Sequence, residues 1–296
     1  QSRYGILKCE GHTKPEFALK DVRDYLIKMV TEQKSQASMA RHLLAIKGRT
    51  RVDNYLLNTT TGSARRTQQA GFARPAAAKS ASGVRPGVLI IHEWWGLNDY
   101  MRERAAQIAA LGYVALAVDM YGEGKIGSSP DEAGALMTTV LNDMEIGTAR
   151  LQAAFDALAD HALVDNARIG ATGYCFGGAM VLHMARIGMP LRAVVSFHGA
   201  LGSFHKPAVG EVKAKILVCH GAADSLVPDD DVANFKLEMK DAQADMDFVA
   251  YDGALHGFTS RDANDNGKKY GLPLAYDEIA DQESWQAMKD LFSQVF

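Results

Sequence analysis

Cysteine is scarce in this chain of 296 residues and long apolar runs are missing, and both absences narrow its class. Three cysteines, an odd number without metal-ligand spacing, argue against a disulfide scaffold and against a bound metal. Free thiols suit a reducing compartment, so we predict a cytoplasmic protein. No run approaches the roughly 18 apolar residues that a membrane span needs, so no membrane partner is expected.

Acidic residues are missing from residues 59–83, a stretch rich in Thr, Ala, Arg, Gln and Ser. Residues 1–86 carry 16 Lys and Arg against 6 Asp and Glu, whereas residues 87–296 carry 16 against 29. This asymmetry predicts an N-terminal extension over 1–83, partly helical or disordered, and one catalytic domain over 84–296. Because the basic residues of the extension are scattered without interleaved aromatics, a nucleic-acid-binding arm is the weaker interpretation.

A regular pattern of apolar strands separated by helices begins at Pro86. The strands lack polar alternation, which predicts an α/β fold with a mostly parallel sheet covered by helices on both faces. In such a sheet, catalytic side chains lie in loops beyond the carboxyl ends of the strands. The expected strands are 87–91, 113–118, 168–172, 193–197, 215–219 and 247–251, and the expected helices are 99–111, 131–141, 146–159, one after residue 176, 231–239 and one at the C-terminus.

The sequence Gly-Tyr-Cys-Phe-Gly-Gly at residues 173–178 joins a strand to a helix through a tight turn. This context is that of the nucleophile elbow GxSxG, with Cys175 in place of the serine. The N-terminus of a helix has a positive field, which favours a thiolate there. Most cysteines are small buried hydrophobes, and we interpret Cys9 and Cys219 in that way. The glycine pattern favours a nucleophile at Cys175.

A nucleophile of this kind needs a histidine base and an acid that orients it, which follow it in the order acid, histidine. Asp224 lies in the loop after the strand at 215–219, and His256 lies in the loop after the strand at 247–251. His198 and His220 also follow strands and remain competitors for the base. The alternative acids at 229–231 resemble the solvated start of a helix.

The sequence His-Glu-Trp-Trp-Gly-Leu-Asn at residues 92–98 follows the first strand of the regular region. In this fold that loop supplies one backbone N–H of the oxyanion hole, and the residue after the nucleophile supplies the other. The predicted donors are therefore the amides of Trp94 and Phe176. Glu93 lies beside them, and its alternative interpretation is a surface carboxylate that caps a loop.

Six motifs together resemble the dienelactone hydrolase (carboxymethylenebutenolidase) family of the α/β-hydrolase superfamily: HEWWGLNDY, DMYGEG, GYCFGG, HGAADSLVP, LHGFT and SWQAMKDLF. The resemblance covers residues 84–296 and implies a catalytic triad of Cys175, His256 and Asp224. It also implies that Glu93 contacts the nucleophile thiol and helps to form the thiolate.

This sequence differs from the family members that are specific for dienelactones in the residues expected to bind the substrate. The resemblance implies that those members hold the substrate carboxylate with arginines. This chain offers Tyr121 and Lys125 in the loop after 113–118, and Arg261 five residues beyond His256. These three residues are the predicted substrate-binding side chains. A lysine lacks the bidentate fork of arginine, so carboxylate recognition is expected to be weaker or different.

The resulting prediction is a hydrolase that cleaves an ester or lactone, of dienelactone type, through a cysteine acyl-enzyme without metal or cofactor. The expected partner is the small-molecule substrate, and the expected state is a monomer or a small homo-oligomer. A broad carboxylesterase or thioesterase is the alternative within enzymes. A non-catalytic ligand-binding protein is the alternative from another class.

Overall fold

The computed structural model describes residues 52–54, 59–61 and 83–296. Strands β1 (Val52–Asn54) and β2 (Thr59–Thr61) pair antiparallel as a two-stranded sheet. The remainder of the predicted extension, and Cys9 with it, lies outside the described residues.

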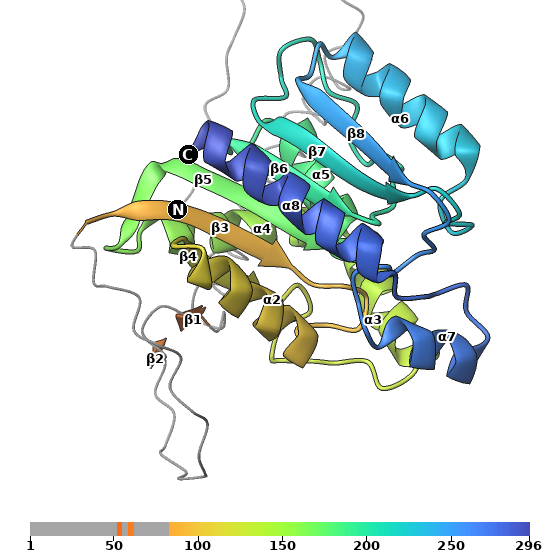
Figure 1. Ribbon diagram of the computed structural model, residues 1–296. Helices are drawn as coiled ribbons and strands as arrows, with labels where there is room; N and C mark the ends of the chain where they lie inside the picture. The colour runs from red at the N-terminus through yellow and green to blue at the C-terminus, as the bar shows by residue number, and fades with distance from the viewer. Residues whose placement is uncertain (1–51, 55–58, 62–82) are drawn as a thin grey trace, which may run out of the picture. The chain divides into compact units, whose positions relative to one another are not determined.

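The main body contains a six-stranded sheet in the order β4-β3-β5-β6-β7-β8, and every neighbouring pair is parallel (Figure 1). This arrangement confirms the predicted α/β fold. The expected strands are all present, most of them longer than the apolar runs that indicated them. They are β3 (Arg85–Ile91), β4 (Val114–Val118), β5 (Val164–Tyr174), β6 (Ala193–Phe197), β7 (Lys215–Gly221) and β8 (Met246–Tyr251).

Helices cover both faces of this sheet, as the sequence predicts. Helices α2 and α8 pack on one face, and α4 and α5 pack on the other, so two hydrophobic cores lie on opposite sides (Figure 1). The helices are α2 (Asp99–Ala110), α3 (Pro130–Leu141), α4 (Met144–Ala159), α5 (Phe176–Arg186), α6 (Asp229–Asp241), α7 (Ala263–Tyr270) and α8 (Glu278–Val295). In the part of the chain that is described, none of them combines the length and apolarity required to cross a membrane.

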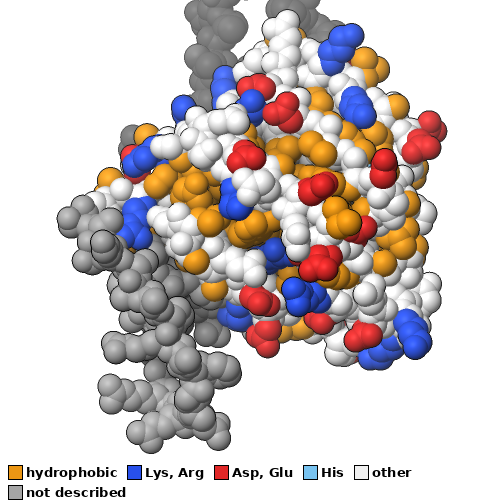
Figure 2. Space-filling model, in the orientation of Figure 1, with side chains coloured by type: hydrophobic (Ala, Val, Ile, Leu, Met, Phe, Trp, Pro, Cys, Tyr) orange, Lys and Arg blue, Asp and Glu red, His pale blue; other side chains and the backbone are white. Residues whose placement is uncertain are grey.

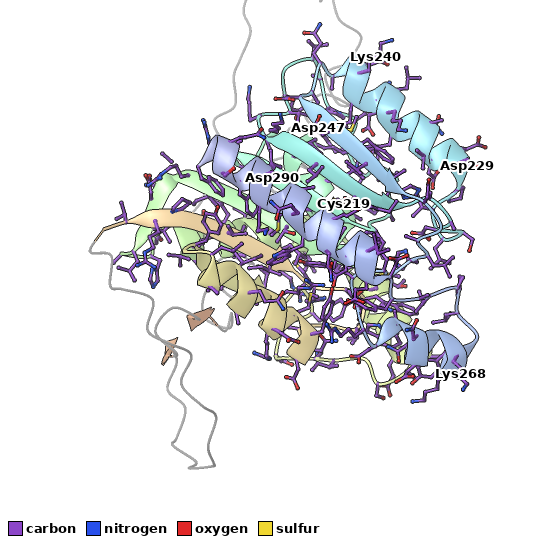
Figure 3. All side chains as sticks on the ribbon, viewed as in Figure 1. Cys219, Asp229, Lys240, Asp247, Lys268 and Asp290 are labelled. Atoms are coloured by element: carbon purple, nitrogen blue, oxygen red, sulfur yellow. The ribbon has the colours of Figure 1, made fainter. Side chains whose placement is uncertain are left out.

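Local sequence explains where the helices begin. The Asn98 side chain accepts the amide hydrogen of Met101 and caps α2, as expected from an Asn before a helical run. Helix α6 begins with three acidic residues at 229–231 and has Lys240 in its last turn, and charges in these places interact favourably with the helix dipole. Figure 3 labels Asp229 and Lys240 near the two ends of this helix. Charges of both signs are interspersed with apolar side chains on the face of the molecule that Figure 2 shows.

Two elements differ from the sequence-based expectation. Helix α7 was not predicted, because it has almost no apolar periodicity: only Ala263 and Gly267 are buried. Strand β8 forms the edge of the sheet, and most of its residues are partly or fully exposed, so it is not covered on both faces. Edge strands commonly carry polar residues, here Asp247.

The strand order reverses at β3, whose neighbours β4 and β5 lie on either side of it. Ile91 at the end of β3 pairs with Gly173 near the end of β5. The loops that follow these two strands therefore leave the sheet side by side. In open α/β sheets such a switch point forms the crevice in which ligands bind.

Candidate active site

Cys175 occupies a strained turn between β5 and α5. Its backbone has φ 53° and ψ −116°, a conformation with positive φ that non-glycine residues rarely adopt. Its N–H donates to the Phe197 carbonyl oxygen at 3.0 Å, and α5 begins at the next residue. The side chain is partly exposed. The sequence-predicted elbow thus presents a thiol at the N-terminus of a helix.

The glycines of the elbow are needed because backbone lies against them. A Cβ at Gly173 would lie 2.0 Å from the Gly177 oxygen, and a Cβ at Gly177 would lie 2.2 Å from the Ile91 oxygen. A Cβ at Gly178 would lie 2.7 Å from the Gly199 Cα. These approaches bring α5 directly onto the ends of β3 and β6, and this fixes where the thiol stands.

His256 and Asp224, from loops 32 residues apart, meet at a hydrogen bond of 2.8 Å between Nδ1 and Oδ2. Both side chains are buried. Burial lowers the pKa of His256, but the charge of Cys175 and the hydrogen bonds to Asp224 and Cys175 outweigh it and raise this pKa well above its usual value. The structure therefore brings together the thiol, the imidazole and the carboxylate that the sequence selected.

The competing residues are used elsewhere. His198 hydrogen-bonds through Nε2 to the Thr259 hydroxyl at 2.7 Å. His220 is buried and packs against Phe248. The acidic residues at 229–231 lie in the first turn of α6. Asp224 instead accepts from the Leu226 amide at 2.9 Å, so its carboxylate is held by its own loop as well as by His256.

The loop after β3 is held in place by side chains on both sides of it. The Met120 amide donates to His92 Nε2 at 3.1 Å, and the Tyr121 hydroxyl donates to the Trp94 carbonyl oxygen at 2.8 Å. The Tyr121 ring also stacks on Phe176 with centroids 5.8 Å apart. Trp94 and Phe176, whose amides are the predicted oxyanion donors, both line the cavity beside Cys175. Tyr121 supports these two residues and does not itself line that cavity.

Glu93 is buried, with 5% of its surface exposed, which contradicts its interpretation as a surface carboxylate. Burial raises the pKa of Glu93 to about 7, against the opposing positive charges of His256 and Arg104. Glu93 lines a polar pocket of about 240 Å³. The role of Glu93 toward the Cys175 thiol stays a prediction.

The cavity beside the thiol has a volume of about 460 Å³ and an apolar lining. Lys125 lies outside it, exposed, with its Nζ 3.5 Å from Glu123. Arg261 also lies outside it, with its guanidinium 5.7 Å from the centre of the Tyr276 ring. The lining therefore contains neither of the two predicted cations. It consists of Cys175 and His256 with Trp94, Met137, Leu141, Phe176, Ala179, Ala200, Gly202, Ser203, Phe204, Leu226, Val227, Leu272 and Leu274.

The described residues contain no group of three or more His, Cys, Asp or Glu side chains placed to hold a metal ion. Cys219 is buried in β7 (Figure 3), and burial raises its pKa to about 12, as expected for a structural thiol.

Sequence reasoning missed a buried hydrogen-bond network behind His256. It joins His198 and Thr259 to Tyr100 and Arg104, on a different element of the fold. Thr259 stands in the LHGFT motif and His198 was noted only as a competing base. No spacing in the sequence relates them to α2, because only the fold brings residues 155 or more positions apart into contact.

Known proteins share sequence and fold with this chain. A family model described as the dienelactone hydrolase family matches residues 72–296. Protein usf of Aquifex pyrophilus is 30% identical over 214 residues, 71% of this chain and 88% of that protein. A dienelactone hydrolase-like promiscuous phosphotriesterase from metagenomic libraries has a TM-score of 0.68 at 37% identity, covering 74% of this chain and 90% of that chain. An esterase of Thermogutta terrifontis, 17% identical, has a TM-score of 0.51 over 74% of this chain and 86% of that chain, which shows a shared fold alone.

Proposed function

Because the chain belongs to the dienelactone hydrolase family, we propose that it hydrolyses an ester or lactone through an acyl-enzyme on Cys175. The Cys175 thiol transfers its proton to His256 and attacks the carbonyl carbon, and the carbonyl oxygen becomes an oxyanion. The tetrahedral intermediate collapses to a thioester, and His256 returns the proton to the leaving alcohol. Water, deprotonated by His256, then releases the acid and the free thiol.

Three features support these roles. The Asp224 hydrogen bond of 2.8 Å orients the imidazole so that Nε2 is free for the thiol. The raised pKa of His256 favours the imidazolium, which is the partner of a thiolate. Trp94 and Phe176 border the cavity where the oxyanion would form, and each such amide donor is typically worth about 3 to 4 kcal/mol.

We infer the class of substrate from the lining of the apolar cavity. No Arg or Lys lines it, and the predicted cations Lys125 and Arg261 lie outside it. A substrate carboxylate placed there would lose its hydration without gaining an Arg or Lys partner, at a cost of several kcal/mol. The cavity favours a neutral ester or lactone with an apolar acyl or alkyl group over a carboxylate-bearing dienelactone.

The test compares substrates and variants in one assay. We expect turnover of a neutral aryl ester with an apolar acyl chain, slower turnover of a lactone with a free carboxylate, and loss of at least about 10³-fold in kcat for Cys175→Ala. Cys219→Ala is the matched control and is expected to keep its activity, because that thiol is buried away from the cavity. Wild-type turnover by Cys175→Ala would refute the acyl-enzyme.

A neutral phosphotriester is a second candidate substrate. The cavity lining is uncharged apart from the proposed catalytic pair, and the similar solved structure of 37% identity is named a promiscuous phosphotriesterase. Attack of the thiolate on phosphorus would release an alcohol and leave a phosphorylated thiol. We expect a burst of one alcohol per protein molecule with Cys175 present and none with Cys175→Ala.

A further inference from the structure

A second histidine stands directly behind the proposed catalytic one. His198, at the end of β6, is fully buried and meets the His256 ring edge-on, with centroids 5.3 Å apart and planes at 65°. Its backbone has φ 38°, which costs free energy for a residue with a side chain, and its N–H donates to the Cys219 carbonyl oxygen at 2.8 Å. Such a strained conformation persists only where the surrounding packing and hydrogen bonds hold the residue in it.

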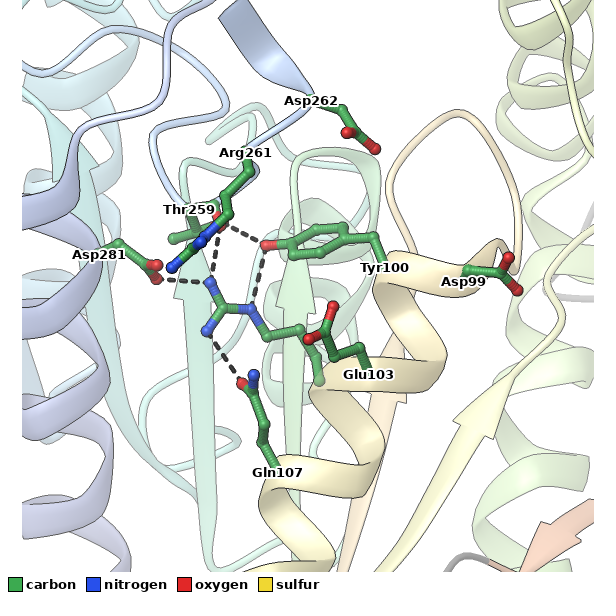
Figure 4. Close-up of a pocket in the computed structure, with 9 residues that line it drawn as sticks. Asp99, Tyr100, Glu103, Gln107, Thr259, Arg261, Asp262 and Asp281 are labelled. Carbon is green, nitrogen blue, oxygen red and sulfur yellow. Dashed lines mark hydrogen bonds and ion pairs between the residues drawn. The ribbon is translucent and has the colours of Figure 1, made fainter. Parts of the chain in front are cut away.

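A chain of hydrogen bonds runs from this histidine to α2. His198 Nε2 and the Thr259 hydroxyl are 2.7 Å apart, and the Thr259 and Tyr100 hydroxyls are also 2.7 Å apart. The Tyr100 hydroxyl in turn accepts from Arg104 Nε at 3.3 Å. Figure 4 draws the last two of these interactions as dashed lines.

The charge of Arg104 gives this chain a direction. A guanidinium only donates, so the Tyr100 hydroxyl accepts from it and has its own hydrogen left for Thr259. With the Tyr100 hydrogen directed to it, the Thr259 hydroxyl has its own hydrogen left for His198 Nε2. In this arrangement His198 is the neutral tautomer with its hydrogen on Nδ1, an atom that is buried without a partner in the described structure.

Arg104 is itself held firmly. It is 7% exposed and donates to the Thr259 carbonyl oxygen at 2.7 Å, to Asp281 at 2.5 Å and to Gln107 at 3.2 Å. These contacts border a polar cavity of about 450 Å³ (Figure 4), which shares no lining residue with the apolar cavity. Four of its five N–H donors are used in this way, and Arg104 holds Thr259 both directly, through the Thr259 carbonyl oxygen, and indirectly, through the Tyr100 hydroxyl.

We propose that Thr259 and His198 are positioning residues that hold the His256 imidazole in line with the thiol. This inference rests on the proposed acyl-enzyme function. Asp224 fixes only one edge of the His256 ring, and the His198 ring packs against that ring in a T-shaped contact. Burial, with the charges of His256 and Arg104, lowers the pKa of His198 well below its usual value. The His198 ring therefore stays neutral and does not repel an imidazolium at His256.

The experiment removes one hydroxyl at a time and separates kcat from KM with a neutral aryl ester. Thr259→Val keeps the shape of the side chain and removes both hydrogen bonds, and we expect kcat to fall between about 10-fold and 100-fold. KM is expected to change less than about twofold, because Thr259 does not line the apolar cavity. Thr259→Ser restores the hydroxyl and is expected to restore kcat.

The matched control is Thr148→Val. Thr148 also hydrogen-bonds a buried histidine, His183, at 3.0 Å, but this pair takes no part in the proposed site. We expect unchanged kcat for Thr148→Val. Wild-type kcat in Thr259→Val overturns the inference, and so does a loss that Thr259→Ser fails to restore, since that outcome indicates a merely structural role.

Tyr100→Phe keeps the inference testable if Thr259→Val does not fold. It removes the donor to Thr259 and leaves the ring in place, and we expect a kcat loss smaller than that of Thr259→Val but above threefold. Unchanged kcat in Tyr100→Phe together with misfolded Thr259→Val overturns the proposal. Cys175→Ala, measured alongside, identifies a failure of the proposed function itself, because turnover would then persist without the thiol.

Discussion

The packing of α5 against β3 can be tested with a single methyl group at Gly177. A Cβ there would lie 2.2 Å from the Ile91 oxygen and 2.7 Å from the His92 oxygen. Ordinary contact needs about 1 Å more, and both obstacles are backbone at the end of a central strand, so α5 must move away from the sheet. Overpacking of this kind typically costs 1 to 3 kcal/mol, and rigid neighbours place Gly177→Ala at about 3 kcal/mol.

That destabilisation corresponds to a fall in Tm of about 6 to 12 °C, measured by calorimetry or by circular dichroism. The control is Gly134→Ala in α3, where a Cβ meets no atom within 4 Å. Alanine is a better helix former there by about 0.5 to 1 kcal/mol, so its Tm is expected to rise slightly.

Activity provides a second readout for the same variant. A shift of α5 displaces Phe176 and Cys175 relative to the loop at 92–98, so Gly177→Ala is expected to lose about 100-fold in kcat below its Tm. If Gly177→Ala matches the wild type in both Tm and kcat, the close approach of α5 to β3 is wrong, and with it the argument for the position of the thiol.

Three further predictions follow from the site and its surroundings. Between pH about 4.5 and 7 folded Glu93 keeps a proton that the unfolded chain has lost, so the free energy of unfolding falls on the order of 3 kcal/mol as pH rises through this window. Glu93→Gln is expected to remove this fall, as measured by urea unfolding at several pH values. The same variant is expected to lower activity and to change its pH profile. Arg186→Met removes the guanidinium that donates to Glu238 at 2.8 and 3.0 Å, and because Glu238 is only partly buried we expect a loss of about 1.5 to 3 kcal/mol in the same unfolding assay. Unchanged stability would contradict a stabilising role for this ion pair. Leu226→Arg places a cation at the apolar cavity. We expect kcat/KM to fall about 10-fold for a neutral ester and to rise for a carboxylate-bearing lactone. Equal effects on both substrates would contradict the proposal that this cavity binds the substrate.

Much of the fold could be predicted because its signals are local. The apolar runs at 87–91, 193–197 and 215–219 are covered on both faces, so their sequences show no polar alternation. Helix α7 and the exposure of β8 could not be predicted in this way. Few of their side chains enter the core, so their sequences carry little hydrophobic periodicity.

In the candidate site, too, some features follow from local sequence and others from tertiary contacts. The sequence by itself determined the elbow around Cys175, because a turn that tight demands glycine at fixed offsets, and it selected Asp224 and His256 by their place after successive strands. Only the tertiary structure decided that Glu93 is buried, that Lys125 and Arg261 lie outside the cavity, and that Thr259 connects His198 to α2. The physical reason is that burial, charge pairing and side-chain hydrogen bonds depend on what the fold brings into contact from distant parts of the chain.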